Sequence, residues 1–342
     1  MSQLPVPNFF HAANADKLMP VPYQQRSADA LQWVKDHKIP VSAKDRTKVA
    51  LMAIDCQGTF CLPNGELFVG GQSGTGAVDD CVRLAEFIYR NLAHLTKIYP
   101  TLDTHMSFQI FHDTFWVNEK GDHPAPATMI SVDDVKNGTW RIDPAVAPIA
   151  GGNYPLLQRY AQHYTQKLAD GGKYPLIIWP FHAMLGGVHH ALVPVIEEAV
   201  FFHSIARKSQ VGFEIKGGNP LTENYSVLGP EVTVGVDGAP IAQKNSKFFK
   251  SLVNHDAVII AGQAKSHCVA FTIDDLLNEI KTQDPELVKK VYLLEDCTSS
   301  VVIPGVVDFT PQGDDAFRRF SDAGMHVVKS TTPMEDWEGI KF

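Results

Sequence analysis

From about residue 48 onward, short apolar runs alternate with stretches in which apolar residues recur every three or four positions. The run VALMAI (49–54) ends at Asp55, and the run DAVIIAG (256–262) ends in glycine. Uninterrupted apolar runs of this length are typical of strands that are buried on both faces of a sheet. The same pattern predicts further strands at KIYPTLD (97–103), YPLIIWP (174–180), VGFEI (211–215), VYLLED (291–296) and MHVVKS (325–330).

Helical spacing is clear after the first of these strands, where Val78, Leu84 and Ile88 fall on one face. The same spacing predicts helices at 28–36, 156–168, 188–204, 246–253, 268–281 and 314–323. Strands that alternate with helices predict an α/β fold with three layers, α/β/α, around a mostly parallel, doubly wound sheet. Ligands bind such sheets beyond the carboxyl ends of the strands.

The hydrophobic pattern and the local composition along the chain predict one domain with an N-terminal extension and an insertion. Residues 1–45 are polar and weakly patterned, and we expect them to form an N-terminal extension that packs on the domain or on a neighbouring subunit. Residues 46–342 carry the alternating pattern. Within them, residues 106–173 are rich in aromatic residues, proline and glycine and are too long for a simple connection, which predicts an insertion near a site.

Composition and charge narrow the class of protein. The chain is 44% hydrophobic and has a formal net charge of −8 with no basic stretch to offset it, which argues against a nucleic acid or an anionic membrane as partner. No apolar run approaches the roughly 20 residues that span a bilayer. Five cysteines without a CxxC pair, and an N-terminus without a signal peptide, predict reduced thiols in a cytoplasmic protein.

Chemically active residue types follow several of the predicted strands. Asp55 follows the first, and Asp103 and His105 follow the second. His182, Lys216 and Cys268 come after later ones. Because parallel strands end at one edge of the sheet, these side chains are expected to lie near one another.

Cys268 lies where a strand turns into a helix. A thiol at a helix N-terminus faces the positive end of the helix dipole, which favours the reactive thiolate, and the free N–H groups there can hold an oxyanion. A buried structural cysteine is the alternative, and we apply it to the other four cysteines. Asp55 could take the thiol proton and return it to a leaving amine, and Lys216 could hold the two negative charges in place.

Asp103 and His105 point to the same side of an extended segment. Together with His182 they form a ligand set that suits a divalent transition metal with open positions, with zinc as the first choice and iron or manganese as alternatives. Phe60 and Trp179 flank these positions and could sandwich a flat ring. Solvated polar residues and plain core aromatics are the alternative interpretations.

Five ordered motifs resemble those of the isochorismatase-like cysteine hydrolases, and most closely the nicotinamidase branch of that family. The motifs are DCQGTFCLPNGEL (55–67), TLDTH (101–105), WPFH (179–182), KGGNPLTENYS (216–226) and AGQAKSHCV (261–269). The N-terminal extension and most of residues 106–173 lie outside the resemblance.

The resemblance implies a six-stranded parallel sheet of order 3-2-1-4-5-6 and a catalytic triad of Asp55, Lys216 and Cys268. It implies a metal on Asp103, His105 and His182 that meets the pyridine nitrogen of nicotinamide, with Phe60 and Trp179 along the ring. It also implies an oxyanion hole from the N–H groups of Ala264 and Cys268, and a cis peptide bond between Gln263 and Ala264.

The sequence differs from the family pattern in several places around the ring-binding pocket. Gln109 stands about where nicotinamidases carry a further histidine, and Ser266 and His267 precede the nucleophile in place of the more frequent aspartate and tyrosine. The predicted activity is therefore cleavage of nicotinamide or a similar heteroaromatic amide. Another small amide or carbamoyl substrate, or a non-catalytic scaffold, remain alternatives, and a homo-oligomer is expected.

Overall fold

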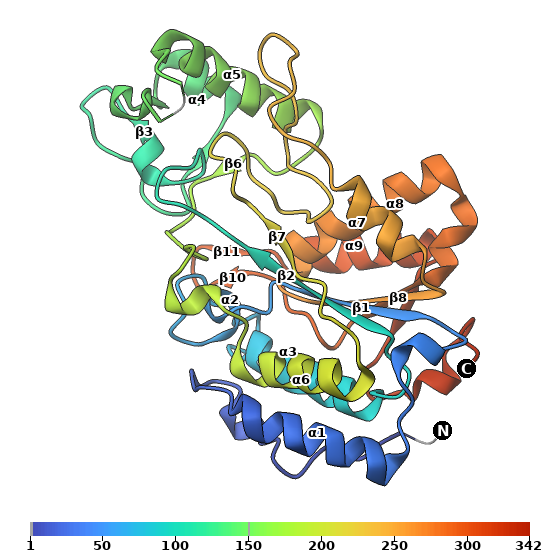
Figure 1. Ribbon diagram of the computed structural model, residues 1–342. Coiled ribbons are helices and arrows are strands. Elements are labelled where there is room, and N and C mark those ends of the chain that lie inside the picture. The colour runs from blue at the N-terminus through green and yellow to red at the C-terminus, as the bar shows by residue number, and fades with distance from the viewer. Residues whose placement is uncertain (1–2, 150) are drawn as a thin grey trace.

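The computed structural model describes residues 3–149 and 151–342 (Figure 1). Its central sheet has six strands, all paired in parallel. Their order across the sheet is β12-β9-β8-β1-β2-β7. Numbered by their sequence within this sheet, the strands read 3-2-1-4-5-6 from the β7 edge, which confirms the predicted fold class and strand order. The bounds are β1 Val49–Ile54, β2 Lys97–Asp103, β7 Glu214–Lys216, β8 Ala257–Gly262, β9 Val291–Leu294 and β12 His326–Val328.

Helices cover both faces of the sheet (Figure 1). One face packs against α3 (Gly76–Arg90) and α6 (Pro194–Arg207), and the other against α7 (Ser246–Val253), α8 (Ala270–Gln283) and α9 (Thr310–Asp322). All six residues of β1 and all six of β8 are buried, because each strand lies in the middle of the sheet between the two layers. Their continuous apolar sequences reflect this burial.

Two predicted helices begin later than expected. Pro194, not Val188, opens α6, since a proline is favoured in the first helical turn, where its missing N–H has no partner to lose. A π-helical turn, Lys265–Val269, contains Cys268 and precedes α8.

The segment 174–180 is not a strand of the central sheet, and that prediction was wrong. Only β6 (Leu176–Ile177) forms there, and it pairs antiparallel with β4 (Met129–Ile130). The next two N–H groups, of Ile178 and Trp179, bond to Thr128 and Phe111. The segment is apolar because it lies in a separate hydrophobic core, not in the sheet.

That separate core joins the predicted insertion, residues 106–173, to the segment 176–179 that follows it, and lies at one end of the sheet (Figure 1). Besides β4, the regular elements of the insertion are β3 (Trp116–Val117), α4 (Val132–Asn137), β5 (Arg141–Ile142) and α5 (Tyr154–Asp170). Ser131 and Asp134 form a capping box that fixes the start of α4. The remaining short elements are α2 (Gly58–Cys61), β10 (Val302–Ile303) and β11 (Val307–Asp308).

The N-terminal segment packs on the outside of the helical layer. Its helix α1 (Tyr23–His37) lies against α6, where Arg26 forms an ion pair with Glu198 at 2.6 Å (Figure 1). Among the described residues, no helix is both long and apolar enough to cross a membrane.

Candidate active site

Cys268 is held at the carboxyl edge of the sheet by the turn that follows β8. The strand ends at Gly262, the Gln263–Ala264 peptide bond is cis as the family resemblance implies, and Cys268 follows in the π-helical turn. Both Ala264 and Cys268 are buried and line the same pocket. Their assignment as an oxyanion hole remains a prediction.

Asp55, Lys216 and Cys268 come together in one buried network. The Lys216 ammonium lies 3.0 Å from Oδ2 of Asp55 and donates to Sγ of Cys268 at 3.5 Å. Thr101 on β2 fixes the carboxylate of Asp55, because its hydroxyl donates to Oδ1 and its Oγ1 accepts the Asp55 N–H. Three strands, β1, β7 and β8, thus deliver the three predicted residues to one point.

Burial and charge set the protonation of this network. Burial raises the pKa of the Cys268 thiol well above its usual value; Lys216 offsets part of the rise, and the charges of Asp55 and Asp103 add to it. Burial also raises the pKa of Asp55 despite Lys216. Burial would lower the pKa of Lys216, but Asp103 and Asp55 hold it well above its usual value. Burial and the two carboxylates therefore oppose the dipole-stabilised thiolate that the sequence suggested at Cys268, whereas Lys216 favours it.

The three predicted metal ligands form one buried cluster whose donor atoms lie within 4.8 Å of one another. Nε2 of His105 is 2.8 Å and Nε2 of His182 is 3.7 Å from Oδ2 of Asp103. Burial would raise the pKa of Asp103, but His105 and Lys216 hold it well below its usual range. One carboxylate and two imidazoles are donors that a divalent transition metal accepts, so the residues present fit such an ion.

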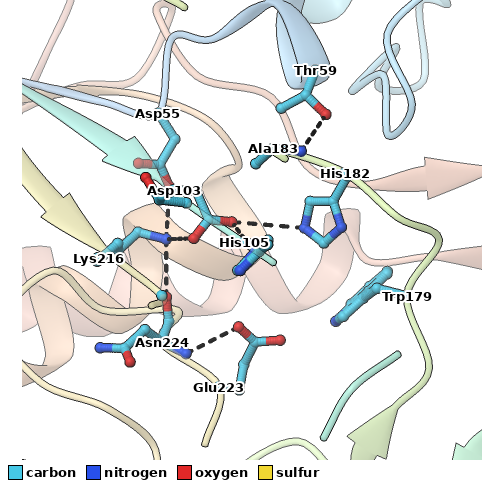
Figure 2. Close-up of polar contacts among 12 residues, drawn as sticks. Asp55, Thr59, Asp103, His105, Trp179, His182, Ala183, Lys216, Glu223 and Asn224 are labelled. Atoms are coloured by element: carbon cyan, nitrogen blue, oxygen red, sulfur yellow. Dashed lines mark hydrogen bonds and ion pairs between the residues drawn. The ribbon is translucent and has the colours of Figure 1, made fainter. Parts of the chain in front are cut away.

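Neighbouring groups hold these ligand side chains in position. His182 donates from Nδ1 to the Pro180 carbonyl at 2.7 Å. This leaves Nε2 directed toward Asp103, as Figure 2 shows. Gln57 bonds to both the N–H and the C=O of Asp103. Gly217 has a φ of +91° and passes so close that a Cβ there would lie 2.9 Å from Oδ1 of Asp103. Only glycine adopts this conformation and spacing without strain.

A pocket opens beside the thiol and the cluster, with an empty volume of about 400 Å³ including its mouth. Phe60 on α2 and Trp179 line it, and their contact with a flat ring stays a prediction. Phe60 makes an edge contact with His182 at 5.6 Å, and Trp179 donates from Nε1 to the Tyr225 hydroxyl at 3.0 Å. The remaining lining residues are Leu67, Val69, Asp103, His182, Glu223, Tyr225, Ala264, His267, Cys268 and Val301.

The structure brings all predicted site residues together and adds others that sequence reasoning missed. Glu223 is buried in the wall of the pocket. Its burial, and to a smaller extent the charge of Asp103, raise the pKa of its carboxyl to about 8. Figure 2 shows this carboxyl below Lys216, with Oε1 accepting the Asn224 N–H at 2.9 Å. Gln57 and Glu223 both lie inside the motifs quoted above, but nothing in the pattern distinguishes them from solvated loop residues. The side-chain amide of Gln109 accepts the Met106 N–H and donates to the Gly217 carbonyl.

Comparison with known proteins places the fold. A scan against protein-family models and a search of curated proteins found no match. Among solved structures the chain is similar to yeast nicotinamidase bound to the inhibitor nicotinaldehyde, with 16% identity, 82% of this chain and 99% of that chain covered, and a TM-score of 0.50. A nicotinamidase pyrazinamidase of Acinetobacter baumanii matches at 16% identity over 84% and 98% of the two chains, with a TM-score of 0.48. The chain thus has the fold of the yeast enzyme.

Proposed function

We propose that this protein is a cysteine-dependent amidohydrolase that cleaves nicotinamide, or a similar small heteroaromatic amide, to the acid and ammonia. The observation that carries the proposal is the buried contact of Lys216 with both Asp55 and Cys268, beside a pocket that also contains a three-residue metal-ligand cluster. The fold shared with yeast nicotinamidase and the five sequence motifs support the same activity.

In the proposed reaction, Asp55 takes the thiol proton as Sγ of Cys268 attacks the amide carbon, and a tetrahedral adduct with an oxyanion forms. The raised pKa of Asp55 brings its basicity closer to that of the thiol. Lys216 stabilises the negative charge as it moves from carboxylate to sulfur. The N–H groups of Ala264 and Cys268 receive the oxyanion. Asp55 then protonates the amide nitrogen, so that the C–N bond breaks, ammonia leaves and the thioester remains. Asp55 next accepts a proton from the water that hydrolyses the thioester and returns it to the sulfur as the acid is released.

Asp103, His105 and His182 would hold a divalent ion, zinc first and iron or manganese as alternatives. When bound, such an ion supplies a Lewis-acid contact for a ring nitrogen or for water. Phe60 and Trp179 would lie along the faces and edges of the ring. We further propose a cytoplasmic homo-oligomer, as the composition and the N-terminal extension suggested.

The test is ammonia release from nicotinamide, with metal analysis of the same sample. Cys268→Ala is expected to abolish turnover, because no other nucleophile replaces the thiol. Cys297→Ala is the matched control, since Cys297 is also buried but lies outside the pocket. Full activity of Cys268→Ala would exclude the proposed mechanism.

A second candidate keeps the network and changes the substrate to another small amide or carbamoyl compound. The observation that favours it is Glu223, a buried carboxyl in the pocket that the motif comparison does not explain. Ammonia assays over a panel of amides separate the two candidates: a metal-containing protein that ignores nicotinamide but turns over another amide supports the second. A non-catalytic scaffold would have no need of the buried network and is disfavoured.

A further inference from the structure

His267 precedes Cys268 in the chain, and its imidazole is buried in the wall of the same pocket. Only 4% of the residue is exposed, yet its Nε2 has no hydrogen-bond partner among the described residues. Rings surround it at centroid distances of 4.7 to 5.6 Å, from Phe309, Tyr174, Tyr225 and Trp179. Because a buried polar atom without a partner costs free energy, this nitrogen is a feature that a bound ligand would satisfy.

The contacts of Ser266 decide which nitrogen of His267 carries the proton. Its Oγ accepts the N–H of Val301 at 3.1 Å and lies 2.9 Å from Nδ1 of His267. In the tautomer with Nδ1 protonated, the buried Ser266 hydroxyl would have no acceptor among the contacts of the described residues; we therefore assign Nδ1 as the acceptor of the hydroxyl proton. Burial lowers the pKa of His267 to about 3, so the ring is neutral and its single proton is on Nε2. The unpartnered atom is therefore a hydrogen-bond donor.

We propose that Nε2–H of His267 is a specificity-determining donor that selects amides with a hydrogen-bond acceptor, such as a nitrogen, on the ring. This inference rests on the proposed amidohydrolase function. It adds a second point at which the substrate ring is recognised, in an aromatic part of the pocket wall rather than at the charged Asp103 cluster. A site that hydrogen-bonds its substrate rejects analogues without the matching group strongly, since its own donor is then left unpaired.

Binding measurements test the inference separately from the chemistry. Benzamide, nicotinamide and pyrazinamide have the same overall shape and carry zero, one and two ring nitrogens. Their dissociation constants are measured by calorimetry on Cys268→Ala protein, which cannot form the thioester. Ammonia release from the same three amides is measured on the unmodified protein.

The informative variant is His267→Phe, which keeps a ring in the aromatic wall and removes the donor. It is expected to weaken binding of at least one nitrogen-containing amide about tenfold, the loss of one hydrogen bond, while benzamide changes less than twofold. His267→Gln retains an N–H near the position of Nε2 and should recover part of the loss. Tyr174→Phe is the matched control: it removes a hydroxyl from the same wall that bonds to the Ser266 carbonyl at 3.1 Å, and it should leave the ratio among the amides unchanged.

Folding is checked by thermal melting. His267→Phe removes an unpaired donor from an apolar environment but leaves the buried Ser266 hydroxyl without its acceptor, so the two effects on stability oppose each other, and a cooperative melt shows that the variant is folded. Equal weakening of all three amides, or no weakening at all, would overturn the role of His267 and leave the proposed activity intact. Selective weakening without ammonia release from any amide would support His267 and reject the proposed activity.

Discussion

At the scale of single residues, Lys216 decides the electrostatics of the site. Its ammonium is buried and lies 2.9 Å from Oδ1 of Asp103 and 3.0 Å from Oδ2 of Asp55, so one cation serves two carboxylates. It also donates to the Asn224 carbonyl, a contact visible in Figure 2. Two buried carboxylates would repel each other without it. Lys216 thus links the proposed nucleophile and base to the candidate metal ligands.

Replacing Lys216 by methionine should therefore cost both activity and stability. The variant leaves the buried Asp55 carboxylate without its cation and Asp103 with the two histidines alone, which is expected to lower the free energy of unfolding by about 3–5 kcal/mol. Ammonia release should fall at least hundredfold. Lys244→Met is the control, because Lys244 pairs with Glu279 on an exposed surface and such pairs contribute less than about 1 kcal/mol. Urea unfolding measures both; equal stability of the two variants would contradict this role.

At the scale of elements, α6 is fastened to the sheet layer by buried polar groups as well as by apolar packing. Nε2 of His203 donates to the Leu95 carbonyl at 2.8 Å, in the connection before β2. Burial lowers the pKa of His203 to about 4, and the neighbouring charge of Arg207 adds to the effect. The folded protein therefore favours the neutral form of the His203 imidazole.

This histidine predicts a pH dependence of stability. Between pH 6.5 and 4 the unfolded chain binds a proton at His203 that the folded protein does not bind, so stability falls as the pH falls and is fully present above pH 6.5. Between pH 7 and 5 the contribution is about 2 kcal/mol. His203→Gln keeps a side-chain N–H for Leu95 and does not titrate, so its stability should fall less over this range. The free energy of unfolding at pH 7, 6 and 5 measures the difference; an identical pH dependence would exclude it.

At the scale of the whole molecule, the N-terminal segment and the insertion lie on opposite sides of the sheet layers (Figure 1). Trp179 lies in the short segment after the insertion and packs in the core that the insertion shares, so the insertion supports one wall of the pocket. The N-terminal segment lies away from the pocket and is held to α6 by polar contacts. The guanidinium of Arg207 is fully buried, donates to the Pro40 carbonyl and lies 2.6 Å from Oδ2 of Asp45.

Asp45→Ala should destabilise the protein without changing its chemistry. The substitution leaves the buried Arg207 charge unpaired, which is expected to lower the free energy of unfolding by about 3 kcal/mol or more. Asp315→Ala is the control, because Asp315 pairs with Arg318 where both side chains are more than 60% exposed. The rate of ammonia release per folded molecule should match the wild type in both. A loss no greater than that of the control would show that this ion pair does not hold the segment.

The local sequence determined the parallel sheet and most of the site. Apolar runs such as 49–54 and 256–262 are buried on both faces only in the middle of a parallel sheet, so their pattern carries fold information directly. Because the carboxyl ends of such strands share one edge, Asp55, Lys216 and Cys268 could be grouped before any contact was known. The motifs then supplied the candidate roles.

Only the tertiary structure decided which partner each segment has and how each group titrates. Residues 174–180 are as apolar as a central strand but belong to the core of the insertion, because a hydrophobic pattern records burial and not the neighbour that provides it. His182 reaches Asp103 through a loop whose Ala183 carbonyl accepts the N–H of His105. The raised pKa of Cys268 and the unpartnered Nε2 of His267 depend on burial and on groups from distant parts of the chain, which no local pattern contains.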